Sequence, residues 1–200
     1  MKYAKLLGLL AVAAAALMAF AASASATTLT SPPGTTYTGV IEAHAEDPDS
    51  NGQKGVTLDG AANINCTHSQ VAGTVEAHGP STTASGKLTT LTFEECNAHV
   101  TVLKKGELII HTDHVEGDGN GTLTSSGAEV TIQLTSPFVI SCIYSTENTP
   151  IGTLTGSDAG HPTLHIKATI KRTGHSIFCG AEAEWTGSYT VTKPTDLTVD

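Results

Sequence analysis

Apolar and polar side chains alternate most clearly in residues 177–191. The odd positions are mostly apolar and comprise Ile177, Cys179, Ala181, Ala183, Trp185, Gly187, Tyr189 and Val191. Polar residues, including Glu182 and Glu184, occupy most of the even positions. Alternation with a period of two is typical of a β-strand that buries one face. Because the odd side carries the only tryptophan of the chain, we expect the core of a sheet to lie against it.

Further stretches with strand patterns run through the rest of the chain. They are residues 37–45, 56–58, 62–66, 71–77, 87–93, 99–103, 107–115, 129–134 and 164–170. Turn residues separate them, as in antiparallel sheets, and no sustained helical periodicity follows residue 26. The pattern predicts one all-β domain over residues 36–200, built as an antiparallel β-sandwich. A polar leader with two prolines, residues 27–35, is expected to stay flexible before it.

A weak internal repeat relates two parts of the chain. Ile64 and Ile140 each begin an Ile-[Asn/Ser]-Cys sequence that is followed by a Gly-Thr pair and an aliphatic residue. Further downstream, each copy has a Phe followed by a Cys. The shared order predicts two related halves, at about residues 36–105 and 106–200. Coincidence in a sequence rich in Thr and Val is the alternative explanation.

The four cysteines form an even set, which in an exported chain indicates two disulfides. Composition alone allows three pairings. If the repeat is real, each half carries its own bridge. The sequence then predicts the pairs Cys66–Cys96 and Cys142–Cys179.

Residues 1–26 have the pattern of a secretory signal peptide. Lys2 and Lys5 precede a long apolar run, and Ala24-Ser25-Ala26 matches a cleavage site with small residues. Cleavage would make Thr27 the first residue of the mature protein. The alternative is a retained membrane anchor, because the apolar run approaches the length of a short membrane-spanning helix. We expect cleavage, and a secreted or cell-surface protein.

The charge of the chain bears on its partners. Its formal net charge is −9, and removing the two lysines of the signal peptide makes it more negative still. Nucleic acids and anionic membranes bind basic patches, so we expect neither as a partner of the mature protein. The alternative partner is a ligand in the cell envelope or outside the cell.

One acidic segment resembles the start of a calcium loop. Asp47, Asp49 and Asn51 have the spacing of the first calcium ligands in a D-x-D-x-N-G motif. The twelfth position of the motif is Leu58 in place of Glu, although Asp59 could close a looser site. The favoured interpretation is a solvated acidic turn without a cofactor, and a calcium-stabilised adhesion module is the alternative.

Two other groups of residues are candidates for chemistry. Glu182 and Glu184 lie on one face of the predicted strand, at a spacing of about 7 Å that falls within the range of glycosidase carboxylates. His111 and His114 form an H-x-x-H sequence but would point to opposite faces of a strand, and only Asp113 would share a face with His111. That is too few ligands for zinc.

The chain resembles small exported proteins of high-GC Gram-positive bacteria. The likeness rests on the Ala-rich signal peptide, the paired cysteines and a C-terminal block of the form F-C-x(n)-W-x-G-x-Y-T, from Phe178 to Thr190. The resemblance implies export and a β-rich fold, and it carries no activity. Because the sequence predicts a robust β scaffold and contains no matched catalytic set, we expect a non-enzymatic, surface-associated binding or structural module. A secreted hydrolase that uses Glu182 and Glu184 is the alternative.

Overall fold

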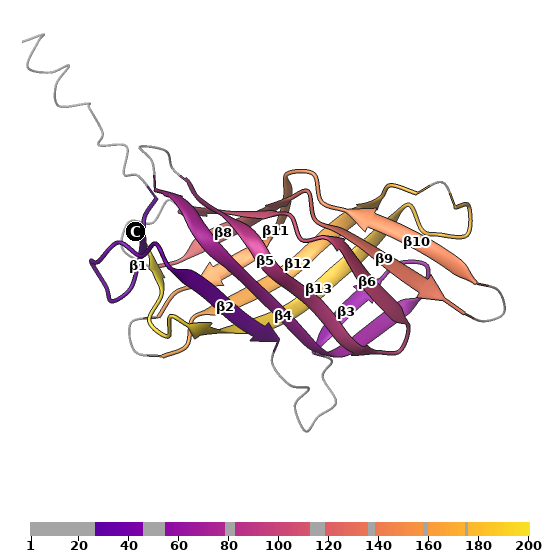
Figure 1. The fold of residues 1–200 in the computed structure, drawn as a ribbon, viewed down its shortest axis with the longest axis horizontal. Helices are drawn as coiled ribbons and strands as arrows, with labels where there is room; N and C mark the ends of the chain where they lie inside the picture. Colours follow the sequence, from indigo (N-terminus) through magenta and orange to yellow (C-terminus); the bar gives the residue numbers. More distant parts are fainter. Residues whose placement is uncertain are drawn as a thin grey trace, which may run out of the picture.

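The computed structural model describes residues 27–45, 55–78, 83–112, 119–135, 139–157, 160–174 and 176–200. These residues form β-strands and no helix (Figure 1). The strands are β1 (Leu29–Thr30), β2 (Val40–Ala45), β3 (Val56–Asp59), β4 (Asn63–His78), β5 (Thr83–Cys96), β6 (His99–Lys104), β7 (Glu107–Thr112), β8 (Gly121–Ser126), β9 (Glu129–Leu134), β10 (Ile140–Ser145), β11 (Thr149–Thr155), β12 (Thr163–Arg172), β13 (Glu182–Lys193) and β14 (Thr198–Val199). The all-β prediction is confirmed.

The main sheet closes into an eight-stranded antiparallel barrel. Strands β4, β5, β7, β8, β11, β12 and β13 follow one another around the wall. The eighth position holds two short strands in line, because β2 and β3 each pair with β13 on one side and with β4 on the other. The predicted sandwich is therefore corrected to a barrel. A sandwich and a barrel both give strands with one wet and one buried face, so alternation alone does not distinguish them.

Three further strands extend the wall at one end. β10 pairs with the last residues of β12, β9 pairs with β10, and β6 pairs with β9. A separate two-stranded sheet, β1 with β14, lies at the opposite end of the elongated body (Figure 1). We call the end with β1 and β14 the cap end, and the end with β6, β9 and β10 the far end. The long strands β4, β5, β12 and β13 reach between the two.

The core lies inside the barrel, where the alternating strands place their apolar side chains. In β12, Leu164, Ile166, Ala168 and Ile170 are buried, and the residues between them are exposed. Trp185 and Tyr189 of β13 are buried as well, so the prediction that this side faces the core is confirmed.

Two predicted boundaries are corrected. Strand β13 begins only at Glu182, and the preceding residues Ile177 and Phe178 are 86% and 70% exposed. The leader was expected to be flexible, but within it β1 pairs with β14, and Leu29 is 1% exposed. Burial of one leucine and pairing with the last strand outweigh the polar composition around them.

Both predicted disulfides are present. Cys66 is bridged to Cys96 across the β4–β5 pair, and Cys142 of β10 is bridged to Cys179, which precedes β13. The two repeat segments themselves lie in different surroundings. The first falls within the single strand β4, whereas the second is divided between β10 and β11, so the likeness in sequence does not extend to the arrangement of the strands.

Candidate functional site

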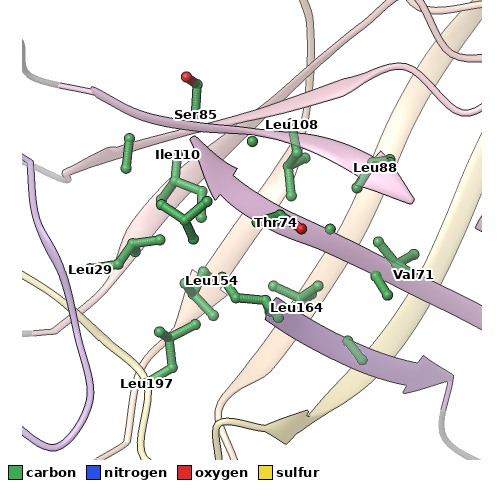
Figure 2. Close-up of a pocket in the computed structure, with 17 residues that line it drawn as sticks. Leu29, Val71, Thr74, Ser85, Leu88, Leu108, Ile110, Leu154, Leu164 and Leu197 are labelled. Carbon is green, nitrogen blue, oxygen red and sulfur yellow. The ribbon is translucent and has the colours of Figure 1, made fainter. Parts of the chain in front are cut away.

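An apolar cavity lies inside the barrel at the cap end (Figure 2). Its walls come from β2, β4, β5, β7, β11 and β12, with side chains such as Ile110, Leu154 and Leu164. The cavity volume is about 40 Å³. On the same measure, one water molecule needs about 10–15 Å³. The lining is almost wholly apolar, so the space suits an apolar group better than water.

Small side chains on three neighbouring strands create this space. Ala43 of β2, Ala72 of β4 and Ala84 of β5 are buried and line the cavity. The interior of an eight-stranded barrel is just wide enough for its own side chains to fill. Where neighbouring strands all contribute alanine, the side chains from the opposite wall do not reach across, and a cavity remains.

Two glycines bring the backbones of β4 and β5 close together in the cavity wall. A Cβ atom on Gly86 would lie 2.5 Å from the carbonyl oxygen of Thr74, and one on Gly73 would lie 2.7 Å from that of Lys87. Real Cβ atoms do not approach backbone oxygens so closely, so a side chain at either position would push the strands apart. The close pairing of β4 and β5 therefore requires both glycines.

The chain segments around β1 and β14 cover the cavity at its outer end. Leu29 of β1 and Leu197, which precedes β14, both line the cavity and are 1% and 0% exposed. Thr30 Oγ1 lies 2.6 Å from Thr198 Oγ1 and donates to Asp200 Oδ2 at 2.8 Å. We call the β1–β14 sheet together with Leu197 the cap. It joins the start and the end of the described chain over the barrel.

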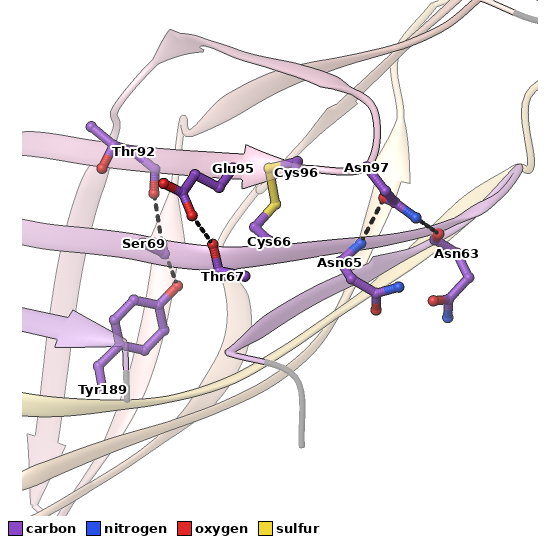
Figure 3. The surroundings of a disulfide bond; sticks show 10 residues. All are labelled: Asn63, Asn65, Cys66, Thr67, Ser69, Thr92, Glu95, Cys96, Asn97 and Tyr189. Atoms are coloured by element: carbon purple, nitrogen blue, oxygen red, sulfur yellow. Dashed lines mark hydrogen bonds between the residues drawn. A yellow bond between two sulfur atoms is a disulfide. The ribbon is translucent and has the colours of Figure 1, made fainter. Parts of the chain in front are cut away.

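A buried polar group lies deeper in the barrel (Figure 3). Ser69 Oγ of β4 donates to the carbonyl oxygen of Thr92 at 2.6 Å, so the hydroxyl of Tyr189, 2.9 Å from Ser69 Oγ, acts as donor to it. Burial raises the pKa of Tyr189 to about 12, an effect that Ser69 and Trp185 partly offset. The tyrosine is therefore neutral at any physiological pH.

Aromatic packing fills the far end of the interior. The rings of Phe93 and Trp185 meet edge to face with their centroids 5.8 Å apart. The Tyr144 hydroxyl is buried beside Gly60 without a partner at hydrogen-bonding geometry among the described residues, and burial raises its pKa. The Cys66–Cys96 bridge lies at this end, next to the hydrogen bonds that Asn97 makes to the backbone of Asn63 and Asn65 (Figure 3).

The two candidate catalytic carboxylates lie on the outside of the barrel. Glu182 and Glu184 are both exposed on β13. Glu182 is opposite Lys171 of β12, and Glu184 lies between Thr169 and Asp59. Neither glutamate lines the cavity at the cap end or the smaller hollow beside Phe93 and Trp185. On β13, the two glutamates point to solvent, and Trp185, which follows them, points into the barrel.

The candidate calcium ligands are only partly within the described structure. Asp47, Asp49 and Asn51 lie outside the described residues, while Asp59 is exposed at the end of β3. Of the histidine sequence, His111 lies on β7, and Asp113 and His114 are outside the described residues. Within the described ranges, no group of three or more His, Cys, Asp or Glu side chains is placed to hold a metal ion.

The cavity residues were not singled out from the sequence. Leu29 falls in the expected leader, Ala43 has the pattern of an ordinary core position, and Ala84 lies between two predicted strands. Their small size is visible in the sequence, but the shared space appears only when β2, β4 and β5 stand side by side. The Leu29–Val199 pairing in turn depends on residues from the two ends of the described chain.

Comparisons with known protein families, curated proteins and solved structures gave no match to this chain. Among the described residues, no helix has the length and apolar character needed to cross a membrane.

Proposed function

We propose that this chain is an exported, non-enzymatic binding protein that holds a small apolar ligand inside its barrel. The observation that carries the proposal is the apolar cavity beneath the cap. Ligand sites are concave and mostly apolar, and closed eight-stranded barrels have an interior that can hold one small ligand. Transfer of an apolar group from water into this space is favourable by about 0.8 kcal/mol of free energy for each methylene buried.

The place of action that we propose is outside the cytoplasm, secreted or at the cell surface. Two disulfides are typical of proteins in oxidising compartments. The signal peptide pattern of residues 1–26 points to the same compartment. Nucleic acids and anionic membranes remain poor partners because the chain is strongly acidic.

Thermal unfolding of residues 27–200, with both disulfides formed, tests the proposal. Small apolar compounds of graded size, such as benzene, cyclohexane, hexane and octan-1-ol, are added one at a time. A ligand that binds only the folded state stabilises it by about 2.7 kcal/mol at a hundredfold excess over its Kd. We expect at least one of these compounds to raise the Tm.

A variant that fills the cavity provides the control. Ala84→Leu adds three carbons to the space, so it should abolish the ligand-dependent rise in Tm. Ala181→Leu adds the same side chain at an exposed position and should leave the rise unchanged. The proposal is wrong if no compound shifts the Tm, or if the Ala84→Leu protein responds as the wild type does.

A further inference from the structure

We propose that the cap is a displaceable plug, and that the ligand is the alkyl chain of a single-chain amphiphile whose head group is uncharged or cationic. This inference rests on the proposed function and adds to it the shape, the polarity and the route of the ligand.

The cavity beneath the cap is too small for most ligands. Its volume of about 40 Å³ compares with roughly 300–1,000 Å³ for sites that enclose drug-sized molecules. Leu29 and Leu197 occupy the outer part of the same interior. Their side chains hold about eight carbon atoms at the density of a packed core. If the cap lifts, the space that they leave joins the cavity into one longer apolar channel.

The cap is attached separately from the barrel wall. Its sheet is distinct from the twelve-stranded sheet, and its ladder comprises two residue pairs, Leu29 with Val199 and Thr30 with Thr198. Its backbone hydrogen bonds to the barrel loops include Val199 N to Gly119 O at 3.1 Å and Ser157 N to Leu197 O at 3.2 Å. Lifting the cap breaks these short contacts and leaves the ladders of the barrel intact. Short segments held by so few contacts open at a lower free energy than the core.

The dimensions of the interior favour a linear ligand. Side chains from opposite walls nearly meet across an eight-stranded barrel, so the cross-section admits one chain of methylenes more easily than fused rings. The lining below the cap, including Val75, Leu88 and Leu108, is apolar along the length of the cavity. The tail would therefore enter first and leave the head group at the cap.

The charges at the cap select the head group. Asp200 accepts a hydrogen bond from Thr30, and Asp196 accepts one from Ser31. Lys193, nearby in sequence, is paired with Glu42 at 3.7 Å. A carboxylate head group placed here would be repelled by Asp196 and Asp200, whereas a hydroxyl or an ammonium would find acceptors. Long-chain alcohols and amines fit this site better than fatty acids.

A cross-linked cap tests the route. Thr30 and Thr198 are directly opposite each other in the β1–β14 ladder, so Thr30→Cys with Thr198→Cys allows a disulfide that locks the cap. Binding of dodecan-1-ol to residues 27–200 is measured by calorimetry and by competition kinetics. We expect the locked protein to bind and release dodecan-1-ol at least about tenfold more slowly than wild type. Each single variant cannot form the bond and loses the Thr30–Thr198 contact, so it should bind and release dodecan-1-ol at least as fast as wild type.

A second variant and a second ligand series complete the test. Leu29→Ala removes part of the plug, so dodecan-1-ol should bind more tightly than to wild type. Dodecylammonium and dodecan-1-ol should bind about tenfold more tightly than dodecanoate, all below their micellar concentrations. Wild-type rates in the locked protein, together with unchanged affinity in Leu29→Ala, would overturn the plug. Stronger binding of dodecanoate would overturn the head-group assignment. If wild type binds none of the chains and none of the small apolar compounds, the proposed function itself fails.

Discussion

Tyr189 connects three strands through one hydroxyl group. It belongs to β13, it donates to Ser69 of β4, and Ser69 in turn donates to the backbone of Thr92 in β5. The ring is fully buried, so it contributes apolar packing while its polar atom is satisfied by a residue 120 positions away in sequence. A buried hydroxyl with a partner costs little, whereas one without a partner costs about 1–3 kcal/mol.

The raised pKa of Tyr189 predicts a loss of stability at high pH. The unfolded tyrosine ionises near its ordinary value of 10.0, whereas the folded one stays neutral to about 12. The folded state therefore holds the proton longer, and its stability is complete below pH 10 and falls as the pH rises toward 12. Two pKa units correspond to roughly 3 kcal/mol in the free energy of unfolding. Guanidinium unfolding at a series of pH values between 8 and 11.5 measures this decline.

Tyr189→Phe is the corresponding variant. At neutral pH its free energy of unfolding should be about 1 kcal/mol lower than that of wild type. The reason is that the hydrogen bond to Ser69 disappears while Ser69 keeps its bond to Thr92. Above pH 10 its stability should fall less steeply than that of wild type, because this position no longer titrates. An equally steep decline in both proteins would show that other groups cause the alkaline loss.

At the scale of strands, the sequence predicts best where apolar alternation is complete. β12 and β13 were predicted because every second residue is apolar over many positions. β8 was missed because one of its inward positions is Ser125, which is buried and bonded to Thr146. β11 was missed because it contains Pro150 and Gly152, residues that weaken a strand pattern and mark a bulge here.

The bulge in β11 makes a prediction about Gly152. A Cβ atom at this position would lie 1.8 Å from the carbonyl oxygen of His165 in β12. Gly152→Ala must therefore push β11 away from β12, and we expect a loss of about 3 kcal/mol in the free energy of unfolding. Gly127→Ala is the matched control, because its φ of +70° is unfavourable for alanine but nothing lies within 4 Å. That variant should lose only about 1 kcal/mol, and equal losses would contradict the steric argument.

The segment before β13 gives a prediction about the Cys142–Cys179 bridge. Ile177 and Phe178 are exposed there, but the segment is held by the bridge and by Arg172, whose Nη1 donates to the carbonyl oxygens of Ser176 and Cys179. Replacing Cys142 and Cys179 by alanine should lower the free energy of unfolding by about 3–4 kcal/mol. It should also make chymotrypsin cleave after Phe178 about tenfold faster, because cleavage follows local opening.

The other bridge is the control for this experiment. Cys66 and Cys96 close a loop of similar span, with a separation of 30 residues against 37. Replacing both by alanine should therefore lower the free energy of unfolding by a similar amount. It should not accelerate the cut after Phe178 under native conditions. If both double variants are cleaved at the same faster rate, cleavage reports global stability and the bridge has no local effect.

At the scale of the whole molecule, closure of the barrel was the step beyond sequence reasoning. Alternation shows which side of a strand is buried, but it does not show which strands are neighbours. Here β13, near the end of the chain, pairs with β2 and β3, near its beginning. The cavity depends on this closure, because the walls that enclose it come from strands distributed over the whole chain.

The long strands predict that the two ends of the molecule unfold together. β4, β5 and β12 line the cavity at the cap end, and β5 and β13 carry the Phe93–Trp185 pair at the far end. Neither end can lose these strands without exposing the core of the other. We therefore expect a single cooperative transition with both disulfides intact.

Trp185 fluorescence reports on the far end, and hydrogen exchange of the β7 and β8 amides reports on the cap end. Both should give the same free energy of unfolding, while the amides of β1 and β14 exchange through a smaller opening. A lower value for β7 and β8 than for Trp185 would mean that the cap end is a separate folding unit.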